Sequence, residues 1–132
     1  EKVNYQTNPI IWGGYGPVSQ HSFYQQIFQG TKDMNLYFLA TRENENKLNT
    51  AQYLGQTQSL SEGTEANEPP HKQVNKRRFT TIEMDNISPR TIGNLIAVWE
   101  SKTIVNSLIW NINAFDQWGV ELGKSNTKKY LK

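Results

Sequence analysis

Short apolar runs alternate with segments of helical periodicity along the chain, and this alternation constrains the possible fold more than any other feature. Strands are predicted at residues 8–12, 35–41 and 79–84, and helices at residues 20–29, 47–61, from 89 onward and from about 115 into the lysine-rich end. Alternation of this kind favours parallel strands, because they need a crossover connection. We therefore predict the α/β class: part of a three-layer αβα sandwich with a small, mostly parallel sheet, ending in two helices.

Three residues mark predicted helix ends. Ser19 and Ser88 are expected to cap helix N-termini, and Gly30 is expected to end the first helix. Residues 35–41 are almost continuously apolar, which favours a strand covered on both faces. The helix that follows Ser88 carries apolar residues around most of its circumference, so we expect it to be largely buried.

Composition excludes several classes of protein. With 36% hydrophobic and 20% charged residues, the chain is not of the disordered type. It has no cysteine, which excludes a disulfide scaffold, a cysteine nucleophile and a thiolate zinc site. A net charge of +2 does not argue for a nucleic acid partner. The longest apolar run, Leu95–Trp99, is far shorter than the ~20 residues of a membrane span, so no membrane partner is expected.

The first residues, Glu1 and Lys2, bear on the cellular location of the protein and on whether the 132 residues are part of a longer chain. They include no Met and begin no charged-then-apolar leader, so no secretory signal is expected. Together with the lack of cysteine, this favours the cytoplasm. The missing Met indicates that the 132 residues are part of a longer chain.

A polar stripe near the end of the chain is the first candidate site. Gln117, Glu121 and Lys124 have i, i+4 and i+7 spacing, so on a helix they would form one line of an amide, a carboxylate and an amine. Two interpretations remain open. The stripe could be a solvated face with a Glu–Lys pair, which contributes only tenths of a kcal/mol, or it could bind a ligand.

His21 is the second candidate. It follows a glycine-rich turn and is expected within the first turn of a helix, where unpaired backbone N–H groups favour a neutral imidazole. A neutral imidazole can accept and return a proton, and ligands of open α/β sheets collect where a strand ends and a helix begins. The alternative is a histidine that hydrogen-bonds its own loop.

Other motifs are weaker. Residues 13–16, Gly-Gly-Tyr-Gly, match neither the dinucleotide fingerprint nor the P-loop, and a plain turn is expected there. His21 and His71 lie fifty positions apart and make a poor metal site, so no metal is expected. The basic residues 76–78, Lys-Arg-Arg, follow an acidic stretch and indicate a solvated loop.

Several segments nevertheless resemble one known family. Residues 20–25 read Gln-His-Ser-Phe-Tyr-Gln, followed by Gln-Gly-Thr-Lys at 29–32, and residues 9–13 read Pro-Ile-Ile-Trp-Gly. Residues 107–124 read Ser-Leu-Ile-Trp-Asn-Ile-Asn-Ala-Phe-Asp-Gln-Trp-Gly-Val-Glu-Leu-Gly-Lys, and this long segment is the most specific. Together they resemble the C-terminal portion of the glucose-6-phosphate isomerase family, whose segments occur in the same order.

The resemblance implies a sugar-isomerase-type domain and reversible conversion of glucose 6-phosphate to fructose 6-phosphate, in glycolysis and gluconeogenesis. It assigns His21 and Lys124 to ring opening and closing and Gln117 to binding of the sugar phosphate. It also implies a homodimer and no cofactor. The glutamate that transfers a proton between the two sugar carbons belongs to a family segment that this chain lacks. Residues 1–132 are therefore expected to be the C-terminal part of the enzyme and inactive alone.

Two other functions remain open. The chain could belong to a non-catalytic, sugar-phosphate-binding regulatory module of the sugar-isomerase type. A nucleic-acid module based on Lys76, Arg77 and Arg78 would bind DNA or RNA in a salt-dependent way. The segments encoded upstream distinguish these functions, because an isomerase requires the missing catalytic glutamate there.

Overall fold

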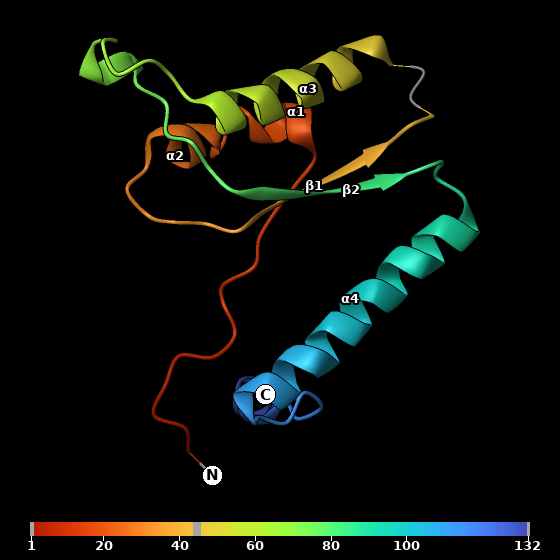
Figure 1. The fold of residues 1–132 in the computed structure, drawn as a ribbon. Coiled ribbons are helices and arrows are strands. Elements are labelled where there is room, and N and C mark those ends of the chain that lie inside the picture. Colours follow the sequence, from red (N-terminus) through yellow and green to blue (C-terminus); the bar gives the residue numbers. More distant parts are fainter. Residues whose placement is uncertain (1, 44–45, 132) are drawn as a thin grey trace. The chain divides into compact units, whose positions relative to one another are not determined.

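The computed structural model describes residues 2–43 and 46–131 (Figure 1). Glu1, Asn44, Glu45 and Lys132 lie outside this description, so the predictions that concern Glu1 have no structural counterpart. The chain divides into two compact units. We call Ile10–Ile92 the sheet unit and the combination of Glu1–Pro9 with Gly93–Lys132 the helical unit, and each is described by itself.

The sheet unit contains the small parallel sheet that the sequence predicts. Strands β1 (Leu36–Thr41) and β2 (Phe79–Met84) pair in parallel, with Leu36 opposite Phe79 and Thr41 opposite Met84. Helix α3 (Lys47–Glu62) lies between them in the sequence and provides the crossover (Figure 1). The α/β class, the strand at 79–84 and the helix from Lys47 are confirmed.

The strand predicted at residues 8–12 is wrong. These residues form no helix or strand, and Ile10 and Ile11 are exposed. The apolar run has strand propensity, but a strand also needs a hydrogen-bonded neighbour. In the described part of the chain, β1 and β2 pair with each other and neither pairs with this segment.

Burial of β1 also differs from the prediction. Phe38 packs its ring against Tyr53 of α3 and Phe79 of β2, with centroids 6.1 and 5.5 Å apart. Tyr37 and Leu39 alternate with Phe38 and are exposed. Within this chain β1 is therefore covered on one face, and the prediction of two covered faces is wrong.

The first predicted helix is divided into two short ones, α1 (Gly16–Ser19) and α2 (Tyr24–Gln29). Ser19 is the last residue of α1, so its predicted role as an N-cap is wrong. Its carbonyl oxygen accepts the N–H groups of Ser22 and Phe23, at 3.0 and 3.1 Å, which closes a turn between the helices. Gly30 ends α2 as predicted. A Cβ at this position would lie 2.2 Å from the carbonyl oxygen of Gln26, which explains why the residue is glycine.

Two helices end the chain, as predicted. Helix α4 (Pro89–Trp110) begins after Ser88, whose Oγ accepts the backbone N–H of Thr91 at 3.2 Å and so confirms the predicted N-cap. Helix α5 (Trp118–Lys128) begins three residues later than predicted. The expectation that α4 is largely buried is wrong, since most of its apolar side chains, Leu108 and Ile109 among them, are exposed.

The connection between α3 and β2 includes a short 3-10 helix, η1 (Pro70–Lys72). Gly63 ends α3 with a positive φ of 63°. Among the described residues, none of the helices has both the length and the apolar character needed to cross a membrane.

Candidate functional site

The end of α4 positions the segment that carries two candidate residues. Asn111 has a φ of 51°, the left-handed conformation that asparagine tolerates better than most residues. The N–H of Ile112 donates to the carbonyl of Ser107 at 3.0 Å, and the N–H of Asn111 to that of Leu108 at 3.2 Å. This pair of bonds is a Schellman motif, which stops the helix and redirects the chain.

Gln117 lies immediately before α5, at its N-cap position. Asn113 Oδ1 accepts the backbone N–H of Phe115 at 2.9 Å, which forms a local turn and delays the start of the helix. Gln117 has a φ of −143°, its carbonyl accepts the N–H of Glu121 at 3.0 Å, and its side chain does not cap the helix. Its amide group is therefore available beside the unpaired N–H groups of the first turn of α5.

Lys124 lies within α5, where helical spacing places it beside Glu121. Its Nζ donates to Glu121 Oε1 at 2.8 Å, and the two side chains are 62% and 57% exposed. The predicted Glu–Lys pair is present, and its solvent exposure makes it weak. The ammonium group of Lys124 can therefore exchange this partner for a ligand at little cost.

The opposite side of α5 is apolar and uncovered in this chain. Trp118 and Leu122 are 77% and 64% exposed, and Phe115, just before the helix, is 80% exposed. Helical spacing places Trp118 and Leu122 on the same side of α5, whereas Phe115 lies outside the helix.

His21 lies in the turn between α1 and α2, rather than in the first turn of a helix as predicted. Its backbone N–H donates to the carbonyl of Val18 at 3.3 Å, and the residue is exposed. Across residues 2–43 and 46–131, no hydrogen bond holds the imidazole ring. The alternative interpretation requires a hydrogen bond from the imidazole ring to its own loop, and the described residues provide only the backbone bond to Val18.

The glycine-rich turn before His21 is anchored to α3. Asn49 Nδ2 donates to the hydroxyl oxygen of Tyr15 at 2.7 Å. Inside the turn, a Cβ on Gly14 would lie 2.9 Å from Ser19 Oγ, so a larger residue would require Ser19 to move. Residues 13–15 form no helix or strand and Gly16 is the first residue of α1, so the plain turn predicted at residues 13–16 is observed only as a connection that leads into this helix.

The candidate residues belong to different units. Gln117 and Lys124 belong to the helical unit, where Gln117 precedes α5 and Lys124 lies within it. His21 belongs to the sheet unit. Sequence reasoning missed Ser107 and Asn111, although an asparagine that follows a long apolar helix is a recognised stop signal.

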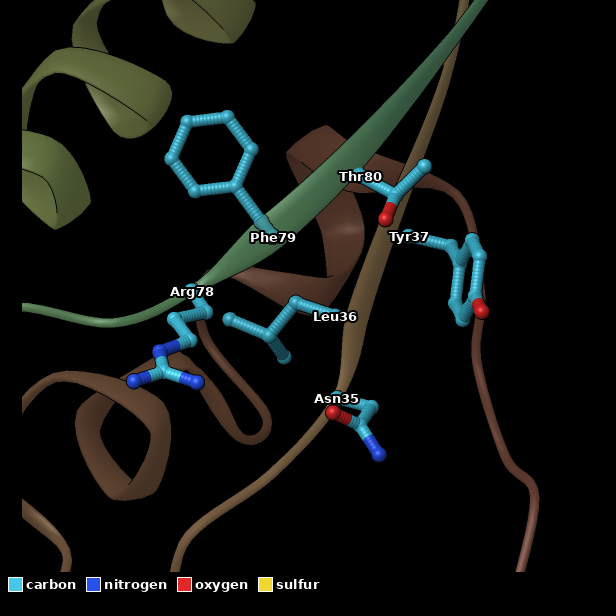
Figure 2. Close-up of a pocket in the computed structure, with 6 residues that line it drawn as sticks. All are labelled: Asn35, Leu36, Tyr37, Arg78, Phe79 and Thr80. Atoms are coloured by element: carbon cyan, nitrogen blue, oxygen red, sulfur yellow. The ribbon is translucent and has the colours of Figure 1, made fainter.

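A shallow depression of about 80 Å³ lies where β1 and β2 begin, and its lining side chains come from these two strand starts (Figure 2). None of His21, Gln117 and Lys124 lines it. Ligands of open α/β sheets bind at the carboxyl ends of the strands, so this depression at the amino ends is not the site that the sequence predicts.

The basic residues 76–78 do not form one solvated cluster. Arg77 is partly buried and donates to the backbone carbonyls of Ile27 and Gly30, whereas Arg78 is exposed and lines the depression of Figure 2. Among the described residues, His, Asp and Glu side chains form no group of three or more that could hold a metal ion.

The whole chain matches a known family. A family model described as phosphoglucose isomerase matches residues 1–132. The chain belongs to the phosphoglucose isomerase family.

Curated relatives of the family are similar over nearly all of the chain. Glucose-6-phosphate isomerase of Deinococcus radiodurans is 42% identical in an alignment 146 residues long. The alignment covers 98% of this chain and 27% of the relative. That of Deinococcus deserti is 38% identical over 154 residues, covering 100% of this chain and 28% of the relative. The chain thus spans little more than a quarter of the length of these relatives.

The fold agrees with a solved structure of the family. The crystal structure of a glucose-6-phosphate isomerase from Chlamydia trachomatis superposes with a TM-score of 0.88 and 29% sequence identity. The match covers 99% of this chain and 28% of that structure.

Proposed function

We propose that residues 1–132 are the C-terminal part of an enzyme that interconverts glucose 6-phosphate and fructose 6-phosphate. The observation that carries the proposal is the family match over the full chain, together with curated relatives named glucose-6-phosphate isomerase. The assembled enzyme is proposed to be a cytoplasmic homodimer that acts on a sugar phosphate and needs no cofactor.

His21 and Lys124 are proposed to open and close the sugar ring. Ring opening removes a proton from the anomeric hydroxyl and adds one to the ring oxygen. A neutral imidazole can accept the first proton, and the Lys124 ammonium can donate the second or stabilise negative charge. Support comes from the exposed position of both side chains and from the weak, replaceable ion pair of Lys124.

Gln117 is proposed to bind the phosphate group of the substrate. Its amide N–H groups are donors, and they lie at the N-terminus of an 11-residue helix. The unpaired backbone N–H groups and the helix dipole at such an end favour anions. The side chain is not used as a helix cap, which supports a role toward a ligand.

The exposed apolar surface supports the proposal that more of the enzyme packs on this chain. Trp118, Leu122 and Leu108 are each more than 60% exposed. Extended apolar exposure of this kind marks surfaces that normally contact protein. We propose that the covering segments come from the remaining family length, which also supplies the proton-transferring glutamate.

The test compares the isolated 132 residues with the enzyme of full family length. Isomerase turnover is expected from the complete enzyme and not from the isolated segment, because the carbon-to-carbon base is absent. Appreciable turnover by the segment would contradict the division of roles. A complete protein that binds sugar phosphates without turnover would instead indicate the regulatory module.

A further inference from the structure

The short helix α2 leads directly from the turn that holds His21. It has six residues, and Ile27 is the one among them that is buried. A helix this short has little intrinsic stability in water. Its orientation, and with it the orientation of the preceding turn, therefore depends on the contacts made at its two ends.

The N-terminal end of α2 is fixed by Phe23. The Phe23 ring packs edge-on against Trp12 with centroids 4.2 Å apart, and its N–H donates to the Ser19 carbonyl at 3.1 Å. His21 lies between Ser19 and Phe23 in this turn. Movement of α2 is thus transmitted to His21 through a connection of two residues.

The C-terminal end of α2 is held by the loop that precedes β2. Arg77 Nε donates to the carbonyl of Ile27 at 3.0 Å, and Arg77 Nη2 donates to the carbonyl of Gly30. The backbone N–H of Asn75 donates to the carbonyl of Phe28 at 2.8 Å. One guanidinium group therefore spans two of the carbonyls that a helix end leaves unpaired.

The chemistry of Arg77 suits this position. A positive charge at a helix C-terminus interacts favourably with the helix dipole. The planar guanidinium directs several N–H groups at once, and hydrogen bonds from a charged donor are stronger than neutral ones. The Arg77 side chain is also partly buried, so its bonds are shielded from water.

We infer that Arg77 is a positioning residue for His21. It fixes the C-terminal end of α2, and α2 in turn fixes the turn in which His21 is presented to the substrate. The inference rests on the proposed function, because it assumes that His21 acts in ring opening. It assigns Arg77 no contact with the substrate.

Arg78 provides a matched control in the same loop. It is the same residue type, adjacent in sequence and exposed. In the described part of the chain it makes no hydrogen bond or ion pair, and it borders the depression of Figure 2. Replacement of either arginine removes one positive charge, but replacement of Arg77 also releases α2.

The experiment uses the complete enzyme with Arg77→Met, Arg77→Lys and Arg78→Met. Ring opening is followed as the interconversion of the two sugar anomers. Proton exchange is followed with a substrate analogue that lacks the ring-closing hydroxyls and stays open-chain. Because displacement of a catalytic group by about 1 Å can cost up to about 100-fold, Arg77→Met should slow ring opening by roughly 10- to 100-fold. Proton exchange and Arg78→Met should stay near wild type.

Arg77→Lys keeps the charge and should recover part of the lost ring opening. If Arg77→Met does not fold, the inference is tested by the ratio of the ring-opening rate to the proton-exchange rate in Arg77→Lys. Equal losses in both rates, or loss in neither, would overturn the inference and leave Arg77 as a structural residue or a dispensable one. Absence of turnover in the wild-type enzyme would instead refute the proposed function.

Discussion

The two regions that carry the candidate residues are held in different ways. The turn around His21 is fixed within this chain by tertiary contacts, which include the Trp12–Phe23 ring contact and the bonds from Arg77. Lys124 lies on a regular helix whose neighbouring apolar side chains are exposed. The position of His21 therefore depends on contacts between distant parts of the sheet unit, whereas that of Lys124 depends, within this chain, on local helix geometry.

The largest expected effect concerns Lys124. In the complete enzyme, Lys124→Ala should lower the ring-opening rate by about 10²- to 10⁴-fold, the range typical for loss of one acid–base group. Proton exchange on an open-chain analogue should fall much less, because that step is proposed to belong to a glutamate outside these 132 residues. Anomer interconversion and exchange rates provide the two measurements.

Lys128→Ala is the control for Lys124→Ala. Lys128 lies one turn further along α5 and is exposed, so its loss removes the same charge from the same helix. It should leave both rates near wild type. Equal losses of ring opening and exchange in Lys124→Ala would refute the role given to this residue.

A smaller effect is expected from Gly63, in the sheet unit. Its positive φ strains any other residue, and a Cβ there would lie 2.9 Å from both the carbonyl oxygen of Val74 and Cγ of Lys76. Gly63→Ala should destabilise the enzyme by about 1–3 kcal/mol. Because Gly63 packs on the loop leading to Arg77, ring opening should slow as well. Denaturant unfolding provides the measurement.

Gly55→Ala is the matched control for Gly63→Ala. Gly55 lies inside α3, and an added Cβ meets nothing within 4 Å. The substitution should stabilise the protein by roughly 0.5–1 kcal/mol, because alanine loses less conformational entropy in a helix. Similar changes from both substitutions would show that the loop between α3 and β2 is not a rigid part of the sheet unit.

The ion pair on α5 should contribute little. Glu121 and Lys124 are both more than half exposed, so Glu121→Gln should change the free energy of unfolding by at most about 0.5 kcal/mol. Glu100→Gln on α4, an exposed residue, is the control. A loss well above 1 kcal/mol specific to Glu121 would show that the complete enzyme buries this face of α5, so that Lys124 too would be held by tertiary contacts.

Sequence predicted best the features that local chemistry determines. Ser88 as a cap, Gly30 as a helix stop and the strand at 79–84 each follow from a few adjacent residues. The failures required knowledge of distant neighbours. Residues 8–12 have strand propensity but no strand partner in the described chain, and α4 has apolar faces that this chain does not cover.

The candidate residues show the same division. The spacing of Glu121 and Lys124 correctly predicted their pairing, because helix geometry alone produces it. The role of Arg77 could not be predicted, since its acceptors on Ile27 and Gly30 lie about fifty residues earlier and are backbone atoms. Backbone carbonyls carry no sequence signal, so the interpretation of residues 76–78 as a solvated loop was natural and, for Arg77, wrong.

The smallest expected effect is a pH dependence in the sheet unit. Burial raises the pKa of Tyr24 above its ordinary value. As the pH rises past about 10, the unfolded chain loses the tyrosine proton before the folded chain does. Unfolding is therefore favoured, and the stability that Tyr24 contributes is lost as the pH approaches its raised pKa.

Tyr24→Phe keeps the ring contacts with Phe23 and Phe28 and should make the free energy of unfolding fall less steeply over this range. Tyr130→Phe, which removes a tyrosine hydroxyl at an exposed position in the helical unit, is the matched control. Urea unfolding at several pH values measures the slope. Identical slopes for wild type and Tyr24→Phe would show that α2 leaves Tyr24 solvated, and would remove one support for the view that the His21 turn is held by contacts inside this chain.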